Sequence, residues 1–461
     1  MTSKRTTGVR EDLHRGLKER HIQLIAIGGA IGVGLFLGSN AAIRAAGPAI
    51  MLSYLIGGVI LYIIMRALGE VTVDCPTSGA FSAHAAMFIS PRAGFIVGWT
   101  YWFMWIVIGM AEFTAVGVYC NFWWPQLPQW IPPLVSLASV TSVNLLTVKL
   151  FGELEFWFAL IKVVTILAMI LFGVIFFING STGVSNLYAL EGGFMPKGFG
   201  GVLSALSTVM FAFIGMELIG VAAGEAASPE KSIPNAIKKV LWRILIFYVG
   251  ALFVIMSIFP WNKIGTNGSP FVLVFEGLGV SSAASLINFV VLTAALSCCN
   301  SGIFSTGRMM YALALQGNAP RIFAKVSRRK IPKRAILLST ALLTIGVLLN
   351  YCIPEKAFAV VTSIATFAAI WVWGTILIVQ MRFRKSKTPE EIAKLKFPTI
   401  WYPIGNWIAL LFLGLVCAIL AYHPDTIVSM IVGPLWIAII SIAYTIKERR
   451  SKKNESVQTH N

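Results

Sequence analysis

Charged residues are scarce in this chain. Only 12% of its 461 residues are Asp, Glu, Lys or Arg, whereas a soluble domain carries about 25%. Acidic residues are the scarcest, with 19 Asp and Glu against 37 Lys and Arg. The 57% share of hydrophobic residues, with 30 Phe and 14 Trp, excludes a disordered chain. Because most residues lie in apolar runs of about 20, the composition indicates a polytopic membrane protein.

Signatures of catalysis, metal binding and nucleic-acid binding are also missing. The six cysteines form no CxxC or other metal-binding spacing, so they are interpreted as small core hydrophobes. The five histidines lie near the ends of apolar runs or in the tails, without an HExxH, GxSxG or P-loop pattern. We therefore expect no enzyme, cofactor or metal site. We expect no nucleic-acid partner either, because the Lys and Arg clusters separate apolar runs instead of marking a globular module.

Twelve apolar runs are long enough, or nearly so, to cross the membrane as helices. They cover residues 22–41, 48–69, 94–120, 131–148, 155–178, 201–222, 241–260, 283–305, 335–352, 357–380, 403–422 and 427–446. With both termini in the cytoplasm, the outer loops hold only four cations, Arg44, Lys197, Lys263 and Lys356. The positive-inside rule favours that orientation.

The segments outside the runs are short. Residues 1–21 and 447–461 are predicted as cytoplasmic tails, and the polar end from Ser451 to Asn461 as disordered. The polar but partly apolar segment from Val71 to Arg92 is predicted to hold a helix at the cytoplasmic membrane surface.

Glycine is concentrated in the first span and just before the sixth. The first reads AIGGAIGVGLFLG over residues 26–38, and the sixth contains FAFIGMELIG over residues 211–220. GxxxG-type helix packing would explain such glycines. A pair of broken helices at equivalent positions of two repeats is the other interpretation, and it is the best sequence indication of a transporter binding site. Because these spans are five apart, the spacing suits two five-helix repeats, over about 22–178 and 201–380, followed by two extra helices over about 403–446.

Several motifs together resemble the bacterial amino acid permeases of the amino acid–polyamine–organocation superfamily. These are RHIQLIAIGGAIGVGLF from Arg20, MRALGE from Met65, GWTYW from Gly98, GELEFWF from Gly152, GEAASPEKSIP from Gly224 and NSG from Asn300. The similarity runs from about residue 14 to 446, and looks strongest to the D-serine/D-alanine/glycine, threonine, proline and histidine permeases. It implies an all-α fold of twelve transmembrane helices with a LeuT-type 5+5 inverted repeat plus two helices, in the bacterial inner membrane.

The resemblance also implies how a zwitterionic amino acid is held at the two breaks. Its carboxylate would meet N–H groups near Gly32, Val33 and Gly34, and its ammonium would meet carbonyl groups near Ala30 and near Phe211, Ala212 and Ile214. Free N–H and C=O groups at half-helix ends suit these two charges.

Three residues are candidates for the pocket around the amino acid side chain. Phe211 occupies the position of an aromatic gate, although simple packing would also explain a membrane Phe. Gly302 is a candidate for the wall formed by span 8. Ser363 on span 10, with Thr366, is a candidate polar contact, although such hydroxyls more often bond to their own helix backbone.

Three ionisable residues lie inside spans, where charge is costly and usually functional. Glu112 in span 3 is a candidate for substrate or proton contact. Glu217 either couples protons or ties the two halves of span 6 together by accepting N–H bonds. Lys162 in span 5 either snorkels to the cytoplasmic interface or, as in proton-coupled members of the superfamily, replaces the cation that sodium-coupled members hold between spans 1, 5 and 8.

The predicted function is secondary active import of a neutral amino acid, by proton symport with alternating access. The expected partners are the amino acid, the proton and membrane lipid. An amino acid exchanger and a transporter-like nutrient sensor remain as alternatives.

Overall fold

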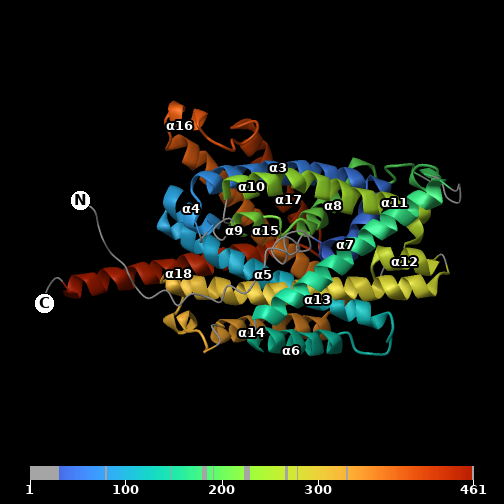
Figure 1. The fold of residues 1–461 in the computed structure, drawn as a ribbon, viewed down its shortest axis with the longest axis horizontal. Helices are drawn as coiled ribbons and strands as arrows, with labels where there is room; N and C mark the ends of the chain where they lie inside the picture. The colour runs from blue at the N-terminus through green and yellow to red at the C-terminus, as the bar shows by residue number, and fades with distance from the viewer. Residues whose placement is uncertain are drawn as a thin grey trace.

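The computed structural model describes residues 31–77, 80–146, 148–178, 184–190, 192–222, 229–264, 268–277, 279–328 and 331–458. Within this part of the chain every regular element is a helix, and the helices form an elongated bundle (Figure 1). The main helices are α2 (Ser39–Ala46), α3 (Ile50–Asp74), α4 (Ala80–Phe88), α5 (Pro91–Asn121), α6 (Ile131–Leu146), α7 (Val148–Ile178), α8 (Gly198–Ala212), α9 (Leu218–Ala222), α10 (Pro229–Arg243), α11 (Ala251–Ile258), α12 (Pro270–Gly277), α13 (Ser281–Leu315), α14 (Lys333–Cys352), α15 (Pro354–Lys385), α16 (Pro389–Ala393), α17 (Ile404–Tyr422) and α18 (Ser429–Gln458).

These helices account for the twelve predicted spans. Nine helical stretches among the described residues are long and apolar enough to cross a membrane, and α6 and α8 are shorter apolar helices. The first stretch, Gly34–Asp74, contains two spans, because the backbone turns at Gly47, where φ is +62°. A side chain at Gly47 would also meet the Pro196 ring at 2.5 Å, so glycine is required at this turn. The prediction of an all-α polytopic membrane protein is confirmed.

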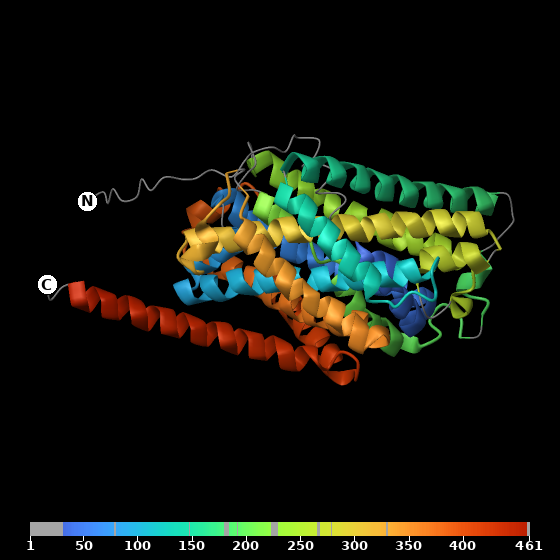
Figure 2. The same ribbon diagram turned by 90° about the horizontal axis from the view of Figure 1, so that it is seen from below.

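The spans differ in how deeply they lie in the bundle. In the best apolar window of α5, 83% of residues are buried inside the protein, against 17% in α18. Figure 1 shows α5, α8 and α15 between α3 with α10 on one side and α13 with α14 on the other. Figure 2 shows α18 along the margin of the bundle, with its C-terminal end projecting beyond it. The central helices therefore line the interior, and α18 presents most of its surface outward.

Two predictions about the segments between spans have different outcomes. The segment from Val71 to Arg92 does contain a short helix, α4, whereas its place at a membrane surface stays a prediction. The expected disorder after Ser451 is wrong for most of that segment, because α18 continues as a helix to Gln458. An i,i+4 ion pair of 3.1 Å between Glu448 and Lys452 explains this in part, because such a pair supports a helix.

Candidate functional site

The described part of span 1 begins at its glycine-rich segment. Ile31 is not helical, and a helix begins with the π-helical turn η1 (Gly34–Gly38), which continues into α2. The Gly32 carbonyl accepts hydrogen bonds from the N–H groups of Leu35 and Phe36, at 3.2 and 3.3 Å. A helix start therefore lies at Gly32, Val33 and Gly34, whose N–H groups stay the predicted partners of the substrate carboxylate. Ala30, the predicted carbonyl partner on this span, lies outside the described residues.

Span 6 is broken within its length. Helix α8 ends at Ala212, residues 213–217 form turns, and α9 begins at Leu218. Gly215 has a φ of +103°, a conformation that favours glycine. The backbone of span 6 thus supports the prediction of a discontinuous helix, whereas residues 22–30 of span 1 lie outside the described residues and its break stays a prediction.

The helix start of span 1 touches the break in span 6. A Cβ added to Gly34 would lie 2.5 Å from the Ala212 Cα and 2.9 Å from its Cβ. Two carbon atoms in ordinary van der Waals contact lie at least about 3.4 Å apart. Backbone therefore meets backbone here, and even alanine at position 34 would force the two helices apart.

The carbonyl groups predicted to meet the ammonium differ in their partners. The Phe211 carbonyl accepts a hydrogen bond from the Ile214 N–H at 3.1 Å. The Ala212 carbonyl accepts one from the Tyr248 hydroxyl at 3.0 Å. No partner is recorded within the described part of the chain for the Ile214 carbonyl, which makes it the most available of the three.

Glu217 lies just beyond the break in span 6 and is fully buried. Its two carboxylate oxygens accept from the Gly215 N–H at 3.2 and 3.1 Å. The Trp373 indole N–H of α15 donates to Oε2 at 3.4 Å. These contacts match the interpretation in which Glu217 ties the broken helix together.

Glu112 lies on α5 directly opposite the break in span 1. A Cβ on Gly32 would lie 2.9 Å from Glu112 Oε1 and 3.3 Å from Cys298 Sγ of α13. Glu112 is 4% exposed, and its Oε2 has no hydrogen-bond partner among the residues described. A buried carboxylate oxygen without a donor is costly, so this atom is positioned to accept a proton or an ammonium group.

Lys162 does not snorkel to the membrane surface. Its side chain on α7 is fully buried. Its Nζ donates to the Ile31 carbonyl at 3.2 Å and to Ser297 Oγ of α13 at 3.3 Å. The ammonium group thus lies between spans 1, 5 and 8, the position that the sequence analysis assigned to it.

The three candidates for the pocket around the amino acid side chain have different surroundings. Gly302 is buried on α13, yet a Cβ added to it would meet nothing within 4 Å. It lies one helical turn after Cys298, on the face that Cys298 presents to Gly32. The Phe211 ring contacts the Phe358 ring edge to face, with centroids 6.2 Å apart. The Ser363 hydroxyl donates to the Val360 carbonyl of its own helix at 2.8 Å, so its oxygen can only accept a further bond.

Comparison with known proteins identifies the family of this chain. The family model described as amino acid permease matches residues 21–457. The chain belongs to the amino acid permease family. It is 52% identical to an uncharacterized amino acid permease, YtnA, of Bacillus subtilis over 98% of this chain and 99% of the relative. It is 47% identical to the amino-acid permease AapA of the same organism, with the same coverage, and 45% identical to the aromatic amino acid transport protein AroP of Escherichia coli K12, over 96% of this chain and 97% of AroP.

The structure of this permease adds site residues that the sequence analysis missed. Tyr248 and Trp373 donate to the Ala212 carbonyl and to Glu217, and Ser297 accepts from the Lys162 ammonium. Cys298, interpreted only as a core hydrophobe, lies beside Gly32 and Glu112. A polar side chain inside an apolar span was the available signal for Tyr248 and Ser297, but its partner is not visible in the sequence.

Proposed function

We propose that this permease imports a neutral amino acid across the cytoplasmic membrane by proton symport with alternating access. The contact between Gly34 and Ala212 carries the proposal, because it joins the helix start of span 1 to the helix end of span 6 in the protein interior. A helix start offers N–H groups and positive partial charge, and a helix end offers carbonyl groups and negative partial charge. One zwitterion satisfies both ends at once, without a charged side chain from the protein.

The groups that would hold the zwitterion follow from this arrangement. The N–H groups at Gly32, Val33 and Gly34 bind the carboxylate. The Ile214 carbonyl binds the ammonium, and the carbonyls of Phe211 and Ala212 contribute through their second lone pairs. Ala30 is proposed as a further carbonyl partner.

A neutral side chain is favoured by the residues proposed to surround it. Phe211, Gly302 and Ser363 carry no charge, and Glu217 is occupied by the Gly215 N–H and the Trp373 indole. A cationic side chain would therefore have Glu112 as its only available carboxylate in the described part of the site. One relative is named an aromatic amino acid transport protein, and that name is compatible with a neutral substrate for this permease.

Coupling is proposed to run through Lys162. When charged, its ammonium joins span 1 to span 8 through the Ile31 carbonyl and Ser297. Loss of the proton removes one donor from this junction and weakens it, which allows span 1 to move relative to span 8. Glu112, the other buried group beside span 1, is the proposed proton acceptor. Glu217 is proposed as a secondary coupling group whose contacts give it a positioning role.

The first experiment identifies the substrate. Purified permease in proteoliposomes is given one radiolabelled neutral amino acid and an inward proton gradient, with every other amino acid as an unlabelled competitor. Competition by neutral amino acids, aromatic ones included, is the expected result. Competition by lysine or arginine alone would contradict the neutral substrate.

The second experiment tests the coupling. Lys162→Gln should abolish accumulation driven by a proton gradient, and a sodium gradient should drive none in the wild type. The control is Lys356→Gln, because the Lys356 side chain is 67% exposed. Gradient-driven accumulation by a folded Lys162→Gln protein at the wild-type level would refute the proton pathway. Uptake that requires amino acid inside the vesicle would indicate an exchanger, and binding without transport would indicate a sensor.

The proposed orientation places both termini in the cytoplasm, with residues 1–21 and 447–461 as tails and the transport domain between them. It also includes the division into two five-helix repeats, residues 22–178 and 201–380, and two additional helices. Cysteine labelling from one side of intact cells at Tyr422 and Gln458, each changed to cysteine, tests it: only the first should react from outside.

A further inference from the structure

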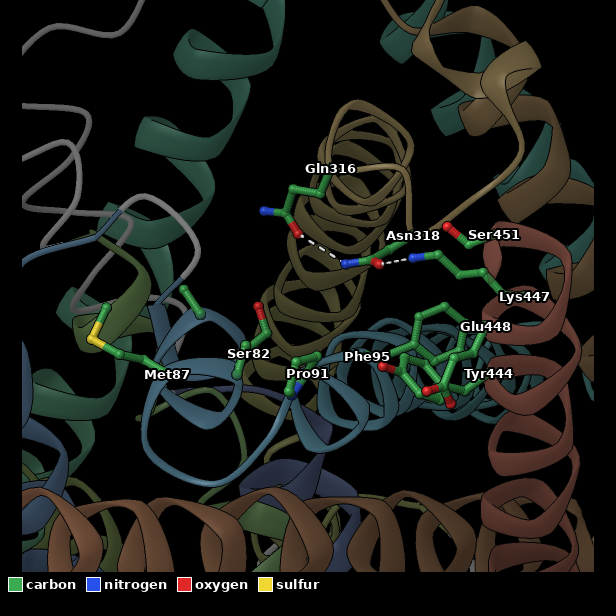
Figure 3. A pocket seen from close by; sticks show the side chains of 13 residues that line it. Ser82, Met87, Pro91, Phe95, Gln316, Asn318, Tyr444, Lys447, Glu448 and Ser451 are labelled. Carbon is green, nitrogen blue, oxygen red and sulfur yellow. Dashed lines mark hydrogen bonds between the residues drawn. The ribbon is translucent and has the colours of Figure 1, made fainter. Parts of the chain in front are cut away.

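A pocket separate from the two helix breaks lies at the outer margin of the bundle. It has a volume of about 620 Å³ and lies between α4, the first turns of α5, the end of α13 and α18 (Figure 3). Its polar wall contains Gln316, Asn318 and Lys447, and its other wall contains Phe95 and Tyr444. The transport mechanism proposed above uses none of these residues.

The pocket has a defined architecture. The Lys447 ammonium donates to Asn318 Oδ1 at 2.5 Å and lies 5.4 Å from the centre of the Phe95 ring. The backbone carbonyl of Asn318 in turn accepts a hydrogen bond from the Trp99 indole N–H of α5 at 2.9 Å. The rings of Phe95 and Tyr444 contact each other edge to face, with centroids 5.4 Å apart. Lys447 is therefore held over the pocket by two neighbours from different helices.

The charge around the pocket favours an anion. Arg92 donates to Thr445 at 2.9 Å and so lies beside the wall formed by α18. The only carboxylate in the lining, Glu448, is paired with Lys452 at 3.1 Å. In the described lining Lys447 is thus left without a carboxylate partner, and Arg92, outside the lining, lies 5.4 Å from the centre of the Tyr444 ring. Two cations with an amide N–H group nearby are typical of a phosphate-binding site.

The position of the pocket along α18 points to a lipid as the source of that anion. The apolar part of α18 ends at Ile446, and Lys447 follows it directly. Ile439, Ile442 and Ile446 are 50, 60 and 49% exposed, and their spacing places them on one outward face of the helix. The outward isoleucines show that this part of α18 faces the hydrocarbon of the membrane, so the pocket lies at the level where the hydrocarbon ends.

We propose that this pocket binds the headgroup of one anionic phospholipid. The phosphate pairs with Lys447, Arg92 adds positive charge from the first turn of α5, the rest of the headgroup lies against Gln316 and Asn318, and the acyl chains extend into the hydrocarbon of the membrane. The inference does not depend on which amino acid is transported or on proton coupling.

The test uses the purified full-length permease and native mass spectrometry. Phosphatidylglycerol and phosphatidylcholine with identical acyl chains are added separately to delipidated protein. The wild type should retain one phosphatidylglycerol under conditions that remove phosphatidylcholine. Lys447→Gln should weaken this binding by roughly 10- to 100-fold, the usual effect of losing a charge-assisted hydrogen bond.

Two further variants separate the pocket from general surface charge. Arg449→Gln removes an exposed cation of the same helix that is outside the lining, and it should retain the lipid. Ser451→Trp fills the pocket without changing its charge, and it should lose the lipid. Equal losses in Lys447→Gln and Arg449→Gln, or full retention in Ser451→Trp, would show diffuse attraction to the helix and overturn the proposal.

A soluble anion is the remaining possibility that the experiment must separate. Inorganic phosphate and glycerol 1-phosphate are added to the wild type and to Lys447→Gln, and the melting temperature is measured. Neither should stabilise the protein as the lipid does, because both lack acyl chains. Stabilisation by a free phosphate that matches the lipid and disappears in Lys447→Gln would replace the lipid with a soluble ligand.

Discussion

Replacing Gly34 with alanine tests whether the close contact of the two breaks is required for substrate binding. The new Cβ would lie 2.5 Å from the Ala212 Cα, so the helices must separate by about 1 Å to restore ordinary contact. Overpacking of this kind costs about 1 to 3 kcal/mol. At about 1.4 kcal/mol for each factor of ten, the population with both half-helices correctly placed falls roughly 5- to 150-fold.

The assay measures binding of the radiolabelled amino acid identified by competition, together with the melting temperature of the purified protein. Gly34→Ala should weaken binding by that factor, and Gly34→Leu should abolish it while the protein still inserts into the membrane. Gly414→Ala on α17 is the matched control, since a Cβ there meets nothing within 4 Å. Wild-type affinity in a folded Gly34→Ala protein would show that the breaks do not form the binding site.

Three further changes test the parts of the fold that support the site. Glu70→Ala should cost about 3–5 kcal/mol of unfolding free energy, because it leaves Arg384 without the buried carboxylate that it contacts twice at 2.7 Å; an unchanged melting temperature would contradict this. Asp425→Asn should change stability by less than about 1 kcal/mol, since its ion pair with Lys356 is exposed on both sides; a loss of several degrees in melting temperature would be unexpected. Burial lowers the pKa of His84 below its ordinary value near 6.5, so the folded state binds the proton less well than the unfolded state. The stability of the fold with a neutral, buried His84 is therefore present at neutral pH and is lost as the pH falls below about 6.5. His84→Gln should flatten the decrease in melting temperature between pH 7 and 5.

The sequence alone was sufficient for the spans and for the place of the break in span 6. A span is specified by about 20 consecutive apolar residues, which is a local property of the chain. The break in span 6 was equally visible, because Gly215 has a φ of +103°, a backbone that other residues resist. For Lys162 the sequence left two alternatives, and the one with the ammonium between spans 1, 5 and 8 came from the resemblance to proton-coupled members of the superfamily.

The tertiary structure decided which groups meet across the bundle. Lys162 contacts the carbonyl of a residue 131 positions away, and Tyr248 contacts the carbonyl of Ala212. No local pattern encodes such pairs, because they depend on how the helices cross. The same holds for Gly34: its sequence context permits either simple helix packing or a broken helix, and only the 2.5 Å approach to Ala212 shows that backbone must meet backbone there. Apolar length and glycine content therefore determined where this chain can span and bend, and the packing of distant helices determined which polar groups the interior brings together.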